Sequence, residues 1–126
     1  MIGNRICAVA LTAASAIVCS TASARGEPFD GNWTIYAQTT RGHCDSLQFG
    51  LGISGGRIHA TGGGYGGYQA RFGGHVSRSG SVQVNAVAGP RTAHGTGRLA
   101  GYQGSGTWAG RGPSGTCSGV WSASRF

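Results

Sequence analysis

Apolar and polar residues alternate along most of residues 29–126, and this alternation constrains the fold more than any other feature of the sequence. The pattern is clearest at 47–53 and 81–88, where every second residue is apolar. A period of two is typical of β-strands that bury one face. No stretch of the same region shows helical periodicity of useful length. The sequence therefore predicts an all-β protein.

The alternating segments are short and are separated by turn signals such as Ser-Gly-Gly, Gly-Pro and Gly-Pro-Ser-Gly. Tight turns between consecutive strands favour an antiparallel meander, and eight strands of this kind can close on themselves and remove their edges. We predict a small eight-stranded antiparallel up-and-down β-barrel with strands at 29–40, 47–53, 57–61, 68–78, 81–88, 91–100, 102–111 and 116–126, and a glycine-rich loop at 62–67.

Glycine is abundant, with 26 of the 126 residues, which raises the alternative of a disordered chain. The aromatic residues argue against disorder, because they supply material for a core. Glycine falls on inward positions of the last three predicted strands, where it leaves room for Trp33, Trp108 and Trp121 from neighbouring strands. The alternation also places Tyr68 and Tyr102 on the inward face.

The first 24 residues have the layout of a cleavable secretory signal peptide. Arg5 precedes an uncharged apolar run at 6–18, and Ala22 and Ala24 supply a small-x-small cleavage site. The run is shorter than the ~20 residues that span a bilayer, so we expect cleavage after Ala24. Lipidation of Cys19 is an alternative, although the preceding valine is larger than the residue that usually precedes a lipidated cysteine.

Cleavage would leave one domain at 25–126, located in the periplasm or outside the cell, with no later apolar run long enough to cross a membrane. In these oxidising compartments we predict a disulfide between Cys44 and Cys117. It would close a loop of 73 residues (117 minus 44), worth about 4 kcal/mol in the chain-entropy model. Two distant cysteines do not make a zinc site, so no metal is expected.

All ten basic residues are arginine, and they are scattered singly. The domain at 25–126 holds nine of them against Glu27, Asp30 and Asp45, a net charge of +6 (nine minus three). No cluster of basic residues indicates nucleic-acid binding. The positive field would attract an anionic envelope component. In the alternative interpretation, the scattered arginines only keep the surface solvated.

Groups for acid–base chemistry are few, so we predict a protein that is not an enzyme and uses no cofactor. The three carboxylates lie within 27–45, and the histidines are single. Residues 52–56 match the letters of the G-x-S-x-G nucleophile motif, but that motif requires a helix after the strand. Residues 62–67 match G-x-G-x-x-G, but no helix N-terminus follows to hold a phosphate.

The segment Gly31-Asn32-Trp33 resembles the opening of lipocalins and other calycins. In that family the tryptophan plugs one end of the barrel and often stacks under an arginine. The resemblance implies that Trp33 closes one end here and that Arg125 is its stacking partner. The chain is much shorter than a lipocalin and lacks the helix before the final strand, and small barrels are often filled by side chains. The opening is also similar to that of periplasmic inhibitors of secreted metalloproteases.

Residues 28–126 as a whole resemble a group of small, exported, glycine-rich proteins of alphaproteobacteria. The resemblance is carried by Phe29-Asp30-Gly31-Asn32-Trp33, by Cys44, and by the segments at 95–99, 104–108 and 117–123. Some members are described as haem-utilisation or adhesion proteins. No residue here lies in a haem-ligand context, so we do not expect haem binding.

These features predict a non-enzymatic, exported binding barrel. In one version it binds a small or amphipathic ligand at a barrel end, contacted by residues from the set Trp33, Trp108, Trp121, Arg125, Tyr65 and Tyr68. In a second version it docks on an envelope or secreted protein, as a protease inhibitor does. A structural or adhesive envelope component is the third alternative.

Overall fold

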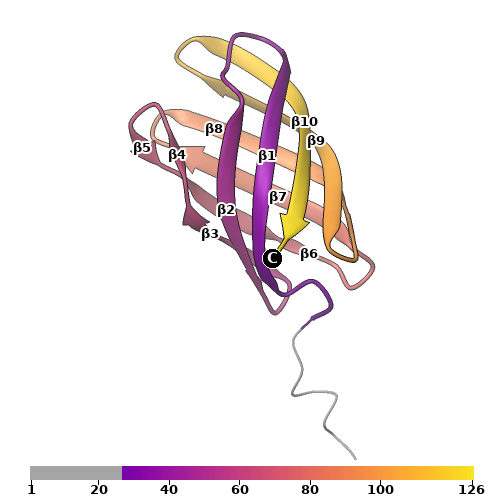
Figure 1. The fold of residues 1–126 in the computed structure, drawn as a ribbon. Coiled ribbons are helices and arrows are strands. Elements are labelled where there is room, and N and C mark those ends of the chain that lie inside the picture. The colour runs from indigo at the N-terminus through magenta and orange to yellow at the C-terminus, as the bar shows by residue number, and fades with distance from the viewer. Residues whose placement is uncertain (1–26) are drawn as a thin grey trace, which may run out of the picture.

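The computed structural model describes residues 27–126, and the predicted signal peptide with Cys19 lies outside the described residues. The described chain is all β, with no helix (Figure 1). Its strands are β1 Gly31–Arg41, β2 Leu47–Ser54, β3 Arg57–Gly62, β4 Gly64–Tyr65, β5 Tyr68–Gln69, β6 Arg71–Val76, β7 Ser81–Ala88, β8 Arg91–Ala100, β9 Gln103–Gly112 and β10 Gly115–Arg125.

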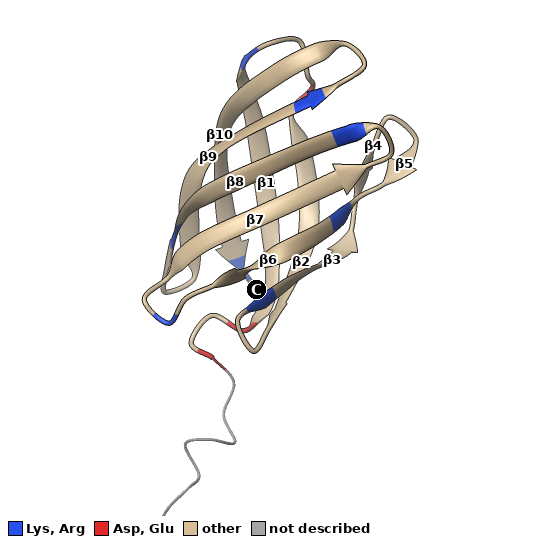
Figure 2. Ribbon diagram, turned by 180° about the vertical axis from the view of Figure 1, so that it is seen from behind, with Lys and Arg blue, Asp and Glu red and all other residues tan. Residues whose placement is uncertain are grey.

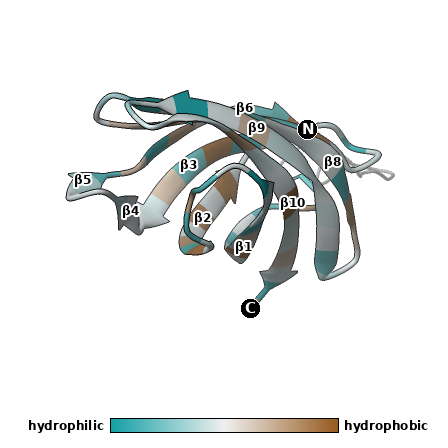
Figure 3. Ribbon diagram, turned by 90° about the horizontal axis from the view of Figure 1, so that it is seen from above, coloured by the Kyte–Doolittle hydropathy of each residue, from teal (hydrophilic) through white to brown (hydrophobic). Residues whose placement is uncertain are grey.

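Eight of these strands form one closed antiparallel barrel in the order β1-β10-β9-β8-β7-β6-β3-β2. The first and last strands close it through a long ladder that runs from Trp33 opposite Arg125 to Arg41 opposite Ser118. The view along the barrel shows the strands arranged around a common interior (Figure 3). The predicted eight-stranded antiparallel β-barrel is therefore confirmed.

The wall is least continuous between β3 and β6, where the ladder contains a single pair, Arg57 opposite His75. One further backbone hydrogen bond lies beside this pair. The Val76 N–H at the end of β6 donates to the carbonyl of Gly56, the residue before β3, at 2.7 Å. The chain between β3 and β6 leaves the barrel as a two-stranded ribbon, β4 and β5. The ribbon projects at one end of the barrel (Figure 1).

Inward side chains pack into one core that includes Trp33, Leu51, Ile53, Leu99 and Trp121. Glycine makes this packing possible. A Cβ atom at Gly97 or Gly106 would collide with the Trp121 ring, so only glycine on β8 and β9 leaves space for the indole of β10.

Four local predictions were wrong, and all concern tyrosine residues or the glycine-rich segment near turns. Tyr102 lies in the β8–β9 turn and is 69% exposed, and Tyr68 is 49% exposed; neither points inward. The expected strand at 68–78 is interrupted, and the expected loop at 62–67 contains β4. Gly66 and Gly67 both adopt positive φ, which permits a two-residue hairpin turn. Period-two alternation cannot distinguish such a ribbon from a barrel strand.

Candidate functional site

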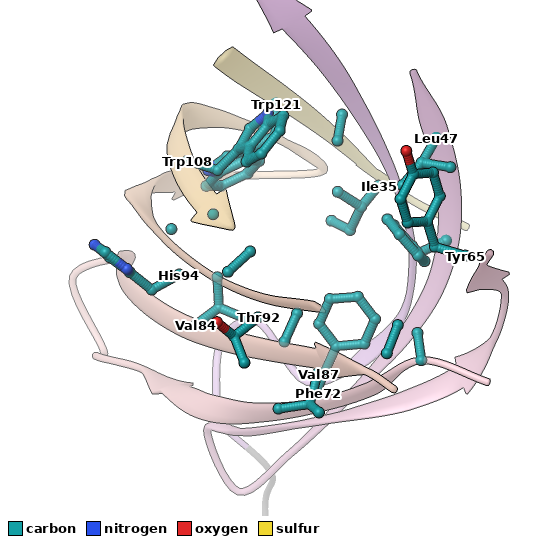
Figure 4. Close-up of a pocket in the computed structure, with 18 of the residues that line it drawn as sticks. Ile35, Leu47, Tyr65, Phe72, Val84, Val87, Thr92, His94, Trp108 and Trp121 are labelled. Carbon is teal, nitrogen blue, oxygen red and sulfur yellow. The ribbon is translucent and has the colours of Figure 1, made fainter. Parts of the chain in front are cut away.

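The barrel encloses a cavity of about 170 Å³ that is lined by side chains from all eight barrel strands (Figure 4). Most of the lining is apolar and includes Ile35, Phe49, Phe72, Val84 and Trp108. No polar or charged residue is buried anywhere in residues 27–126. The cavity therefore offers an apolar environment with few hydrogen-bonding groups.

Side-chain size explains why the interior is not filled. Around the cavity, inward positions carry small residues such as Ala37, Ala86, Ala93 and Gly110. The larger lining residue Phe72 is only partly buried, although its ring meets the Phe49 ring edge-to-face at 5.0 Å. Towards the β2–β3 hairpin, larger buried side chains such as Ile53 and Ile58 line the cavity. The cavity is therefore bounded by large side chains at that end and by small ones elsewhere.

The three tryptophans each use their indole N–H within the fold. Trp33 donates to the Phe29 carbonyl at 2.9 Å. Trp108 donates to the Gln38 carbonyl and Trp121 to the Thr96 carbonyl, both at 3.2 Å. Trp108 and Trp121 come from the paired strands β9 and β10 and form one wall of the cavity (Figure 4). With their polar atoms satisfied, these indoles present only apolar ring surface to the cavity.

Trp33 and Arg125 close the end of the barrel at which the chain terminates. Trp33 is 1% exposed, and the Arg125 guanidinium carbon lies 5.3 Å from its ring centroid and 4.7 Å from that of Tyr102. The same guanidinium donates hydrogen bonds to the carbonyls of Pro28 and Asp30, each at 3.0 Å. The stacking contact implied by the calycin resemblance is present.

The Asp30 carboxylate fastens residues 27–30 across this closed end. It accepts backbone N–H hydrogen bonds from Gly55 at 2.7 Å, Gly56 at 3.0 Å and Glu27 at 3.2 Å. Partial burial works to raise the pKa of Asp30, but these hydrogen bonds and the charge of Arg125 outweigh it and hold the pKa below its ordinary value. The ionised carboxylate is thus part of the closure.

The opposite end is the mouth of the cavity, which we define by the lining residues Cys44, Asp45, Tyr65, Arg91 and Arg111. The predicted disulfide between Cys44 and Cys117 is confirmed, with a Cα–Cα distance of 6.2 Å. It joins the β1–β2 loop to β10 beside the mouth. The disulfide therefore holds one side of the mouth in place.

Tyr65 and Arg91 contact each other at another part of the mouth. The Arg91 guanidinium carbon lies 4.8 Å from the centroid of the Tyr65 ring. The Tyr65 hydroxyl accepts a hydrogen bond from the Asp45 N–H at 3.4 Å, which links the β4–β5 ribbon to the β1–β2 loop. The ring of Tyr68 covers Gly89 in the β7–β8 turn. These contacts hold the ribbon against the open end of the barrel.

The structure brings some of the predicted site residues together and separates others. Trp33, Trp108, Trp121 and Tyr65 line the cavity, whereas Arg125 and Tyr68 do not. Sequence reasoning missed the mouth residues Arg91 and Arg111. The position of Arg91, two residues before the inward Ala93, signalled that it shares the inward face; no comparable signal existed for Arg111.

The two segments whose sequences match enzyme motifs lie in a hairpin and in the ribbon. Residues 52–56 form the β2–β3 hairpin, with Ser54 exposed, and 62–67 form part of the β4–β5 ribbon. Within the described range, no three histidine, cysteine or acidic residues are grouped so that they could hold a metal ion. The same range holds no helix long and apolar enough to span a membrane.

Comparison of this chain with protein-family models, with curated proteins and with solved structures finds no match to any of them.

Proposed function

We propose that this protein is a non-enzymatic binding protein, exported to the periplasm or the cell exterior, that holds a small apolar or amphipathic molecule inside its barrel. The observation that carries the proposal is the apolar cavity of about 170 Å³ behind the mouth. Protein interiors normally pack as densely as organic crystals and contain few voids larger than a water molecule. A void of this size therefore supports a role in binding a small molecule. Apolar pockets with a few polar groups at one end are the usual form of small-molecule sites.

The cavity volume limits the occupant. An apolar cavity of ~150 Å³ takes up one benzene molecule, so 170 Å³ suits one ring or a chain of about six to eight carbons. Burial of each methylene contributes about 0.8 kcal/mol. A chain of this length would contribute about 5–6 kcal/mol, which limits the Kd to about 20 μM at the tightest, and the loss of rigid-body freedom weakens binding further.

The distribution of polar groups supports a binding role over catalysis. Of the three carboxylates, Asp30 fastens the closed end, and Glu27 pairs with Arg78 at 2.7 Å. The His94 ring points away from the cavity (Figure 4). Asp45 is then the one carboxylate left at the mouth, too few for the paired acid and base that hydrolysis of a glycan requires.

The disulfide supports export, because such bonds persist in oxidising compartments and are rare in the cytosol. Fractionation of cells that carry a C-terminally tagged chain tests this part. We expect the tagged protein in the periplasm or medium, with an N-terminus at Arg25. Intact residues 1–24 on a cytosolic product would contradict it.

Ligand binding can be read from Trp108 and Trp121, because bromine at the end of a chain quenches tryptophan fluorescence on contact. We expect the neutral probe 8-bromo-1-octanol to quench the protein saturably. Ala86→Phe, which fills the cavity from β7, should abolish quenching. Ala109→Phe, the same change on the exposed face of β9, is the matched control and should leave it intact. Absence of saturable quenching, or equal quenching in both variants, would refute the binding role.

A second candidate is docking on an acidic partner through surface arginines. Among residues 27–126, Glu27 and Arg78 form the one ion pair, so exposed arginines such as Arg41 and Arg98 carry unneutralised charge. Residues 27–30 lie against the closed end, which disfavours a projecting inhibitory segment. Docking predicts capture of an acidic envelope protein that is lost in high salt; capture that persists in high salt would count against it.

A further inference from the structure

We propose that the ligand carries an anionic headgroup, which the guanidinium group of Arg91 binds at the mouth while its hydrocarbon chain occupies the cavity. This inference rests on the proposed function and names the class of molecule: a free, single-chain anionic amphiphile. The volume of about 170 Å³ accommodates one short chain and excludes a two-chain lipid.

Arg91 lies where a headgroup would emerge. It begins β8 on the inward face, whereas Arg111 stands opposite its neighbour Thr92 in the β8–β9 ladder and is exposed on the outer face of β9. Both are lining residues of the cavity. Figure 2 shows basic residues at the ends of β8 and β9 with an acidic residue close by, and basic and acidic residues together at the opposite end of the barrel. The chain of a bound amphiphile would thus point inward and its head outward, beside the Arg91 guanidinium.

The Arg91 side chain is held in place before any ligand binds. Its aliphatic part covers Gly112, where an added Cβ would lie 2.7 Å from Arg91 Cγ. Its guanidinium then stacks on the Tyr65 ring at 4.8 Å and lies next to Gly66. When the face of a guanidinium lies over an aromatic ring, its N–H groups still point outward in the guanidinium plane. There they can donate a bidentate pair of hydrogen bonds to a carboxylate.

The donors of both arginines are available. In the described part of the chain, neither Arg91 nor Arg111 forms an ion pair, and neither donates a hydrogen bond to another residue. Arg91 is nevertheless only half-exposed, because it lies in the wall of the mouth. A positioned, partly desolvated guanidinium with unused donors favours an anion over a neutral head.

The charges around the mouth sum to +1, since Arg91 and Arg111 oppose the carboxylate of Asp45. Asp45 uses its backbone N–H to reach Tyr65, and its carboxylate pairs with neither arginine. The other two carboxylates lie at the closed end, beside Arg78 and Arg125. An ammonium head would be repelled by this mouth and an anionic head attracted.

Three probes with the same brominated eight-carbon chain separate the headgroup from the chain: 8-bromooctanoate, 8-bromo-1-octanol and 8-bromooctylamine. At pH 7 and low salt, we expect the carboxylate to bind about tenfold more tightly than the alcohol, and the amine more weakly than either. The preference for the carboxylate should shrink in 0.5 M salt, because screening weakens exposed charge pairs. Equal affinity of carboxylate and alcohol would overturn the inference.

Variants locate the preference. Arg91→Gln should reduce carboxylate affinity several-fold while leaving alcohol affinity within about twofold. Arg111→Gln, which removes a charge from the outer face beside the mouth, should reduce carboxylate affinity less. Arg91→Lys keeps the charge and should retain part of the preference. Arg98→Gln removes the same charge from the exposed face of β8 and is the matched control. A loss as large in Arg98→Gln as in the mouth variants would show a diffuse charge effect and refute a mouth site.

The outcomes also separate this inference from the function on which it rests. If the alcohol quenches and Ala86→Phe blocks it, but the carboxylate has no advantage, the cavity binds ligands and the headgroup assignment is wrong. If none of the three probes quenches saturably, both proposals fail. Circular dichroism of each variant shows whether the barrel has folded, and Arg91→Lys provides a second test if Arg91→Gln does not fold.

Discussion

Arg125 stands directly opposite Trp33 in the ladder that joins the last strand to the first, and its guanidinium covers the Trp33 ring at 5.3 Å. This side chain therefore seals the closed end. It joins the end of β10 to the residues before β1 through hydrogen bonds to Pro28 and Asp30, and to the β8–β9 turn through a hydrogen bond to Gly101 at 3.3 Å. The following predictions begin from this closure.

Replacement of Arg125 by methionine should lower the free energy of unfolding by about 2–4 kcal/mol. Hydrogen bonds from a charged donor contribute about 1.5–3 kcal/mol and a cation–π contact about 0.5–1 kcal/mol. Methionine keeps most of the apolar contact, so the loss reports the charge and its hydrogen bonds. Urea denaturation measures it, and Arg98→Met, on the exposed face of β8, should stay within about 0.5 kcal/mol of the parent. Equal stability of the two variants would contradict this account.

The Asp30 carboxylate should make stability depend on pH in the acid range. Because the pKa of Asp30 is lower in the folded than in the unfolded protein, the folded state binds fewer protons there. Its contribution is complete above the ordinary aspartate pKa and is lost as pH falls through the lower, folded value. Asp30→Asn should reduce stability at pH 7 and flatten the acid limb of a denaturation series from pH 6 to pH 2. An unchanged acid limb in Asp30→Asn would count against the carboxylate.

Removal of the disulfide should leave a folded but weaker barrel. The bond closes 73 residues, and loss of such a loop constraint costs about 4 kcal/mol in the chain-entropy model. The β1–β10 ladder is independent of it, so the far-UV spectrum of Cys44→Ala/Cys117→Ala should still be that of a β-protein. The measurement is the shift of the urea midpoint. Two free thiols in the purified parent protein, detected by mass spectrometry, would rule out the bond itself.

A pair of glycine substitutions tests whether the last strands need glycine for packing. An added Cβ at Gly106 would meet the Thr96 carbonyl and the Trp121 ring, whereas at Gly62 it would meet nothing within 4 Å. We expect Gly106→Ala to destabilise the protein by about 1–3 kcal/mol. Gly62→Ala should be neutral or stabilising by a few tenths, because it restricts the unfolded chain. Thermal unfolding of the two variants side by side gives the comparison.

Local sequence was sufficient for the strands and their closure. The alternation at 81–88 and 91–100 predicted two strands with their observed bounds, and the eight alternating segments predicted the number of strands in the barrel. The two cysteines that remain after the predicted cleavage, Cys44 and Cys117, indicated the disulfide. The alternation failed at Tyr68 and Tyr102, because a residue in a turn or ribbon has no fixed inward face.

The cavity and its mouth were decided by the tertiary structure. Whether Ala37, Ala86 and Ala93 leave a void depends on their meeting at one level of the barrel, and that level is set by the stagger between strands far apart in the sequence. Arg91 meets Tyr65 at the mouth because the β4–β5 ribbon lies against the start of β8. Alternation is a property of neighbouring residues along one strand, so it determines which side chains point inward; the register between strands determines which of them share a place inside.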